Sequence, residues 1–311
     1  MRGARLVPIV HAFIDDQVPD RDRRRSLFAG DLFVYNPRPS TLALAAAARA
    51  TLQQVLGPDP AFAQQRCTES EFSALFNAAA RNLSHVVLQL AGAVAVDLGC
   101  DAATTFVGAP SLVATTGMGF LAHGLGVPQH PHRDTWYAAT LCQLNWWVPV
   151  YDLGDSASLA FHPVYWRVPV RNTSASFVFD AWYERHRMGR AAPPADLSDQ
   201  PRALDPIELT PEIRISCPAG GVILSSVAQL YSVVPNETVR IHFGVHFKTL
   251  SSSDLALGNG ATNLDAEAQG TSLSTFVRCS DFTPIPDELT RLHVRGGPPS
   301  PVVEDGPGQP S

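Results

Sequence analysis

The segment 132–134 (HRD), which stands a few residues before 141–150 (LCQLNWWVPV), indicates the fold class of this chain. The second segment is rich in Trp and Val, as β-strands are. Side chains two residues apart on an extended backbone lie on the same side, so His132 and Asp134 are expected to point the same way. With a third ligand from a distant strand, such a pair forms the facial set that holds ferrous iron. The triplet alone is a weak signal, because an exposed loop His beside an Asp looks the same.

Two helices are predicted before the strands begin. Apolar residues at helical spacing predict one helix over 40–56, with Ser40 as N-cap and Gly57 at its end, and a second over about 69–98. After Gly99 the chain changes to short β-rich runs separated by Gly, Pro, Asp and Asn. These runs are 104–107, 111–116, 141–150, 158–161, 222–225 and 239–250. The order predicts a mainly β domain with flanking helices (α+β), either a β-sandwich or a jelly roll.

The chain reads as one domain over 1–295. A polar, Pro-rich insertion over 188–205 is expected to form a surface loop or lid. The segment 296–311 is rich in Pro and Gly and lacks core residues, so it is expected to be a disordered tail.

The composition excludes some classes of function. A formal net charge of -6 and a pI near 5.9 leave no basic excess for binding nucleic acid. No apolar segment is long enough to predict a membrane span or a secretory signal. The five cysteines are scattered without paired spacing, which predicts reduced thiols and a cytoplasmic protein. Lys248 is the only lysine.

Four blocks carry a resemblance to a known family: 131–137 (PHRDTWY), 143–150 (QLNWWVPV), 160–172 (AFHPVYWRVPVRN) and 228–236 (AQLYSVVPN). Together they resemble bacterial iron(II)/2-oxoglutarate oxygenases of the phytanoyl-CoA dioxygenase-like kind, over about 29–286. The resemblance implies a double-stranded β-helix (jelly roll, cupin-like). It also implies an enzyme that uses Fe(II), oxygen and 2-oxoglutarate to oxidise a small molecule.

The match at the reactive centre is incomplete. His132 and Asp134 match the proximal iron ligands of the family, but the distal histidine position is Tyr231. The arginine that binds the far carboxylate of 2-oxoglutarate falls on His242. Arg240 shares strand parity with His242, so it is a candidate replacement for that arginine. We expect the side chains of His132, Asp134 and Tyr231 to converge in one cavity.

Both departures change the chemistry. A phenol has an ordinary pKa near about 10, so Tyr231 must lose its proton to be a good ligand, and a phenolate favours ferric iron. Alternatively, Tyr231 lines the pocket with its hydroxyl on Gln229. Loss of a desolvated arginine–carboxylate pair costs on the order of 2–5 kcal/mol, which puts 2-oxoglutarate in doubt. His242 and His246 lie on one face of their predicted strand, which adds weight to a metal site.

The remaining candidates are polar or aromatic residues in the same blocks. Inward-facing Asn145 and Gln143 are predicted to bind cosubstrate, unless they satisfy buried backbone groups instead. Arg133 and Trp136 either contact substrate at the mouth or pack the loop. The full set of catalytic or substrate-lining candidates is Tyr231, Gln229, Arg133, Trp136 and His246.

Three functions follow from these observations. The first, and the leading interpretation, is an iron-dependent oxygenase with an atypical site. The second is a jelly-roll enzyme that works without 2-oxoglutarate, with Tyr231 as acid–base group. The third is a non-catalytic subunit or binder. The sequence does not fix the oligomeric state, and a homodimer and a heterodimer with an intact homologue both stay open. Ionisable groups kept inside a barrel favour a working pocket.

Overall fold

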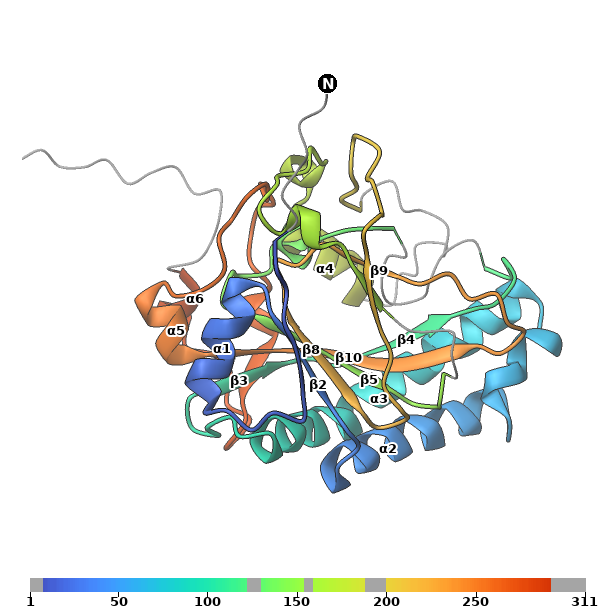
Figure 1. Cartoon of the computed structure of the whole chain (residues 1–311). Coiled ribbons are helices and arrows are strands. Elements are labelled where there is room, and N and C mark those ends of the chain that lie inside the picture. Colours follow the sequence, from blue (N-terminus) through green and yellow to red (C-terminus); the bar gives the residue numbers. More distant parts are fainter. Residues whose placement is uncertain (1–7, 122–129, 154–158, 188–199, 292–311) are drawn as a thin grey trace, which may run out of the picture.

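A mixed β-sheet built from distant parts of the chain runs through the middle of the molecule (Figure 1). The computed structural model describes residues 8–121, 130–153, 159–187 and 200–291. In it the strand order is β1-β2-β8-β5-β10-β3-β11, with β4 beside β10. These strands are β1 (Ala12–Ile14), β2 (Leu32–Tyr35), β3 (Thr105–Gly108), β4 (Ser111–Thr115), β5 (Leu144–Pro149), β8 (Val222–Ser226), β10 (His242–Ser251) and β11 (Phe276–Arg278).

A smaller sheet faces the long one. It has the order β7-β6-β9, formed by Ile213–Ile215, Leu159–Phe161 and Tyr231–Val233, and both of its pairings are antiparallel. Trp147 and Ile223 of the long sheet pack in one apolar cluster with side chains of β6 and β9. The two sheets therefore enclose an interior between them.

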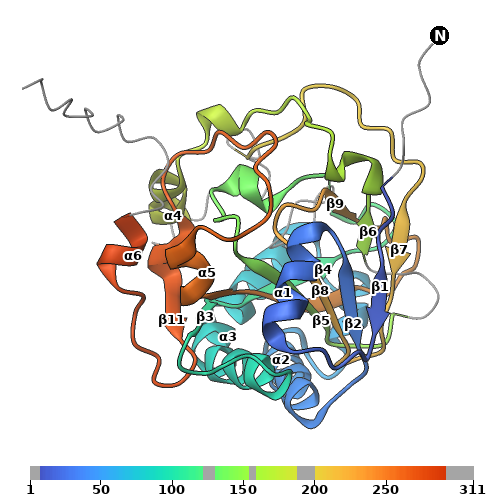
Figure 2. The ribbon, with the colours of Figure 1, turned by 60° about the vertical axis from the view of Figure 1, so that its left-hand side comes forward.

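Helices cover the opposite face of the long sheet. Figures 1 and 2 show α2 (Pro39–Leu56) and α3 (Glu69–Asp97) side by side beneath it. The other helices are α1 (Asp20–Ala29), α4 (Phe179–Arg187), α5 (Ser252–Leu257) and α6 (Asp287–Arg291). Among the helices described, none is long and apolar enough to cross a membrane.

Successive side chains of a strand point to opposite sides, so the two faces of the long sheet carry different residues. Trp146, Phe243 and Phe247 belong to the core cluster that includes α2 and α3. Trp147 points the other way, into the interior between the sheets. A Cβ at Gly244 would lie 2.5 Å from the Trp147 ring, so only glycine leaves room for that indole.

The predicted helices are largely confirmed, since α3 spans Glu69–Asp97 and α2 ends at Leu56 before Gly57. The predicted N-cap was wrong: α2 begins at Pro39, and the Ser40 hydroxyl donates to Asp97 instead. All six predicted strands match within about three residues at each end. The strand predicted over 239–250 begins three residues later, at His242, so Arg240 lies before it.

Some elements were not predicted, and some predicted segments are not described. The elements α1, β1, β2, β7, β9 and β11 were missed because they are short or lack a clear apolar period. Of the predicted insertion, 200–205 has no helix or strand and 188–199 lies outside the described residues. The expected tail over 296–311 also lies outside them.

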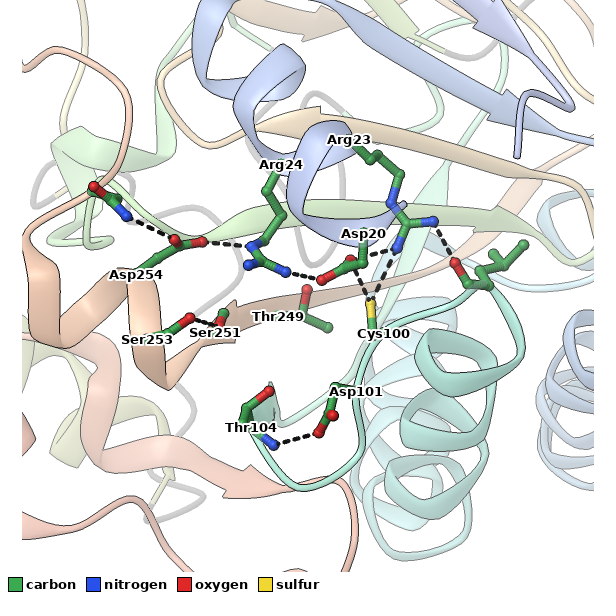
Figure 3. Close-up of polar contacts among 12 residues, drawn as sticks. Asp20, Arg23, Arg24, Cys100, Asp101, Thr104, Thr249, Ser251, Ser253 and Asp254 are labelled. Carbon is green, nitrogen blue, oxygen red and sulfur yellow. Dashed lines mark hydrogen bonds and ion pairs between the residues drawn. The ribbon is translucent and has the colours of Figure 1, made fainter. Parts of the chain in front are cut away.

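A buried ionic network ties α1 to the rest of the domain (Figure 3). Arg23, 2 % exposed, pairs with Asp20 at 2.7 Å and donates to the Leu98 carbonyl at the end of α3. Arg24 pairs with Asp20 and, at 2.5 Å, with Asp254 of α5. Because these guanidiniums satisfy carboxylates and a helix-terminal carbonyl, they hold three helices together.

Removing one member of this network should be costly. We predict that Arg23→Met lowers the free energy of unfolding by about 3 kcal/mol, because it leaves buried acceptors without a donor. Arg25→Met is the matched control on the same helix, since that side chain is 66 % exposed and lies 3.9 Å from Asp22. Urea denaturation measures both, and equal midpoints for the two variants would contradict the role of the network.

Candidate functional site

The backbone brings His132 and Tyr231 together. The amide of each donates to the carbonyl of the other at 3.0 Å, so the two residues form an antiparallel pair. In such a pair both side chains lie on the same face. The Asp134 amide donates to the Val227 carbonyl at 3.1 Å, which fixes the third residue beside them.

The three side chains converge as predicted, at hydrogen-bonding range. The Tyr231 hydroxyl lies 3.0 Å from Asp134 Oδ1 and 3.2 Å from His132 Nε2. His132 Nε2 lies 3.4 Å from Asp134 Oδ1. All three residues are at most 4 % exposed. We call this set of three the triangle.

Lys248 of β10 completes the cluster. Its ammonium lies 3.0 Å from Asp134 Oδ2, the oxygen on the far side from Tyr231. Its side chain is 26 % exposed, whereas that of Asp134 is 6 % exposed, so the cluster reaches solvent on the Lys248 side. The sequence interpretation missed this role, although Lys248 shares strand parity with the predicted His242 and His246.

The charges in the cluster are set by its neighbours. Burial by itself raises the pKa of Asp134, but Lys248, His132 and His246 hold that pKa well below its usual range. Burial and the Asp134 carboxylate raise the pKa of Tyr231 well above its ordinary value. Asp134 is therefore ionised and Tyr231 is a neutral phenol at neutral pH.

The triangle contains two hydrogen-bond acceptors, His132 Nε2 and Asp134 Oδ1, but only one donor, the Tyr231 hydroxyl. His132 Nδ1 lies 2.9 Å from the His130 carbonyl, which can only accept, so Nδ1 carries the proton. In a neutral ring Nε2 is then an acceptor, as is Asp134 Oδ1. One hydroxyl proton on Tyr231 faces both of them, so the cluster can take up a further proton.

The interior next to the triangle is nearly filled. Trp147 and Tyr231 line a cavity of about 10 Å³, together with Asn145, Leu159, Ile223, Ser225 and His246. This is about the size of one water molecule. Burial, with the positive charge of Lys248, lowers the pKa of His246 to about 3, so that imidazole is neutral.

The triangle has the spacing of a metal site but not its chemistry. Ligands about 2.1 Å from an octahedral ion and at right angles lie about 3 Å apart, close to the observed distances. However, the phenol keeps its proton, and Lys248 already compensates the charge of Asp134. Within the described residues, no group of three or more His, Cys, Asp or Glu could hold a metal ion. As they stand, these residues do not fit ferrous iron.

The predicted cosubstrate residues do not form a site for 2-oxoglutarate. Arg240 precedes β10, and its guanidinium lies over the Tyr151 ring, 5.9 Å from the centroid. His242 begins β10, about 13 Å along the strand from His246. The indole of Trp147 lies between these levels, against Gly244. The parity argument for Arg240 was wrong because the strand starts after it.

For Arg133 and Trp136 the structure favours the second alternative, in which they pack the loop. Arg133 pairs with Asp265 at 3.1 Å and also donates to the carbonyls of Ala228 and Tyr165. The Trp136 indole donates to the other oxygen of Asp265 at 2.7 Å. Asp265 therefore fixes the loop that carries His132 and Asp134.

The two glutamines also have structural partners. Gln143 lies before β5, and its amide donates to the Ser272 hydroxyl at 3.0 Å, which favours the structural alternative over the cosubstrate role. Gln229 donates to the Gly30 carbonyl and not to Tyr231, contrary to the prediction. Asn145 does point into the interior, where both polar atoms of its side chain have no partner among the described residues.

The lowered histidine pKa values predict a pH-dependent stability. Burial, with Arg240, lowers the pKa of His242 from 6.5 to about 4, and that of His246 is also lowered. Between pH 6.5 and 4 the unfolded chain binds protons that the folded chain excludes. The free energy of unfolding should therefore fall as pH falls, by up to about 1.4 kcal/mol per pH unit for each histidine.

His242→Asn should flatten this slope, because it removes one of the histidines whose pKa the fold lowers. His11→Asn, which replaces an exposed histidine, is the control. Denaturation series across this pH range measure the slopes, and an unchanged slope in His242→Asn would show that its imidazole is not held neutral by the fold.

Comparisons with known proteins find solved structures that are similar only at low identity. No protein-family model and no curated protein matches the chain. Solved structures that are similar include EvdO2 from Micromonospora carbonacea var. aurantiaca, with 13 % identity over 77 % of this chain and 93 % of that chain, at a TM-score of 0.41. Another is the non-heme alpha ketoglutarate dependent epimerase SnoN from nogalamycin biosynthesis. It has 16 % identity over 75 % of this chain and 84 % of that chain, at a TM-score of 0.37. The non-heme monooxygenase ThoJ has 14 % identity over 68 % of this chain and 69 % of that chain, at a TM-score of 0.36. At these identities and TM-scores the likeness assigns no activity to the present chain.

Proposed function

We propose that this chain is an enzyme that acts on a small molecule by acid–base chemistry at the triangle, without iron or 2-oxoglutarate. The observation that carries the proposal is the ion pair between Lys248 and Asp134, 3.0 Å apart. With the Tyr231 hydroxyl on the other carboxylate oxygen, both oxygens of Asp134 are already engaged.

The proposed scaffold is a jelly roll. The strands β4-β10-β5-β8 form a four-stranded part of the long sheet, and the β7-β6-β9 sheet faces it. His132 pairs with Tyr231 at the edge of the smaller sheet, where a fourth strand would lie. This arrangement of two facing sheets supports the proposal that the triangle lies at the mouth of a double-stranded β-helix.

Each member of the cluster has a part in the proposed chemistry. Tyr231 is the group that gives a proton to the substrate or takes one from it. His132 Nε2 and Asp134 Oδ1 both face that hydroxyl, so either can accept the phenolic proton when Tyr231 receives another. Lys248 keeps Asp134 ionised, and its partly exposed side chain is where the cluster reaches solvent.

The charge of Lys248 opposes metal binding at the triangle. A divalent ion on Asp134 Oδ1 would lie on the order of 5 Å from the ammonium. At an effective dielectric of about 20 the repulsion is about 7 kcal/mol, which weakens metal binding for as long as the ammonium stays in place. A metal would therefore have to displace Lys248 toward solvent and remove the Tyr231 proton.

A second candidate is an iron-dependent oxygenase that binds metal through His132, Asp134 and Tyr231. The spacing of the triangle, 3.0–3.4 Å between donor atoms, favours it. It requires a phenolate ligand and a displaced Lys248. We rank it second for these reasons.

Metal content separates the two candidates. We predict that the protein reconstituted anaerobically with Fe(II) and desalted holds far less than one iron per chain. The double variant Lys248→Met/Tyr231→His should hold close to one, because it removes the competing cation and supplies a second imidazole. Elemental analysis measures both, and His132→Ala in the double variant is the matched control, expected to lose the metal.

One iron per chain in the unaltered protein, lost on His132→Ala, would contradict the proposal and establish the second candidate. A parallel assay measures 2-oxoglutarate binding as a shift of melting temperature, and its conversion to succinate. The proposal predicts that 2-oxoglutarate neither shifts the melting temperature nor is converted to succinate. Conversion to succinate by the unaltered protein would likewise overturn it.

A further inference from the structure

We infer that one water molecule is bound inside the domain, held by Asn145, Trp147 and His246. All three side chains line the cavity of about 10 Å³ described above. They come from neighbouring strands, since Trp147 and His246 are paired across β5 and β10 and Asn145 lies two residues before Trp147. The position is distinct from the ion pair of Lys248 and Asp134, although Tyr231 lines the same cavity.

The inference is carried by polar atoms that have no partner. Among the described residues, Asn145 Oδ1 and Nδ2, Trp147 Nε1 and His246 Nε2 are buried and make no hydrogen bond. Buried polar groups in native proteins nearly always have a partner, either protein or ordered water. Because these three side chains line one cavity, their unpartnered atoms indicate that a ligand there bonds to all three.

The Trp146 indole N–H has a hydrogen-bond acceptor within the protein. Its Nε1 donates to the Thr249 hydroxyl at 2.8 Å, on the opposite face of β5. Trp147 is the next residue and is equally well buried, at 5 % exposed, yet its Nε1 has no such acceptor within the described chain. The cavity is where an acceptor for that N–H can lie.

The size and chemistry of the cavity select water over other ligands. A volume of about 10 Å³ admits one water and no larger molecule. The three side chains offer an indole N–H donor, an amide that donates and accepts, and an imidazole nitrogen. Water can accept from the first two and donate to the third. Lys248, the nearest cation, is paired with Asp134, so the cavity offers no charge for an anion.

This inference goes beyond the proposed function and does not rest on it. The water would be present whether the triangle works by acid–base chemistry or binds a metal. Because Tyr231 lines the same cavity, the water also gives that residue a fixed neighbour, beside the remaining lining residues Leu159, Ile223 and Ser225.

Nuclear magnetic resonance of the unaltered protein tests the inference. The chain has five tryptophans, and Trp147→Phe assigns the Trp147 indole signal by its loss. We expect a nuclear Overhauser cross-peak between that indole proton and a long-lived water. The Trp146 indole, which donates to Thr249, is the internal control and should show none. No cross-peak at Trp147 would overturn the inference.

A crystal structure gives an independent result that does not depend on any variant folding. We expect an ordered water within hydrogen-bonding distance of Trp147 Nε1 and Asn145. An empty cavity, or one closed by a direct bond between these side chains, would contradict the inference. Trp147→Phe should also lower the melting temperature about as much as Trp146→Phe, since both lose a made hydrogen bond. A clearly smaller loss at Trp147 would point to a dry cavity.

Discussion

The ion pair between Asp134 and Lys248 is the interaction on which the site depends. A carboxylate buried to this degree would be neutral without a compensating charge. Lys248 keeps it ionised, and the ionised carboxylate in turn keeps the Tyr231 phenol protonated. The protonation states of the cluster therefore follow from one cation, placed by one residue of β10.

The same strand also builds the core. On one face of β10, Phe243 and Phe247 pack toward α2 and α3, and on the other His246 and Lys248 meet the interior between the sheets. Strand alternation thus allows a single element to supply hydrophobic stability and reactive groups without mixing them. The Trp146–Trp147 pair on β5 repeats this division, one indole in the core and one beside the site.

The sequence predicts the backbone elements better than the roles of individual side chains. The helices over 69–98 and 40–56 and most strands could be predicted, because their apolar periods are long or their β-propensity is high. The convergence of His132, Asp134 and Tyr231 could be predicted as well, since it follows from parity on one segment and from the resemblance that placed Tyr231.

The roles of Arg133, Trp136 and Gln229 could not be predicted from the sequence. Each is set by a partner more than 100 residues away in the chain: Asp265 for the first two, and the carbonyl of Gly30 for the third. No local pattern shows such a partner, because it depends on how loops pack over the sheets. The inward direction of the Lys248 side chain could have been predicted from its strand parity with His242 and His246. It was missed because a lone lysine in a strand is usually solvated.

Because Lys248 is the only lysine, lysine-specific isotope labelling gives a single ammonium side chain to observe. The most direct measurement of the central claim follows that signal by nuclear magnetic resonance while a paramagnetic divalent ion such as Mn(II) is added. The ion pair with Asp134 predicts a signal that stays sharp at one equivalent of Mn(II). Selective broadening of the Lys248 signal at one equivalent, abolished by His132→Ala, would show that the triangle binds a metal and would contradict the account.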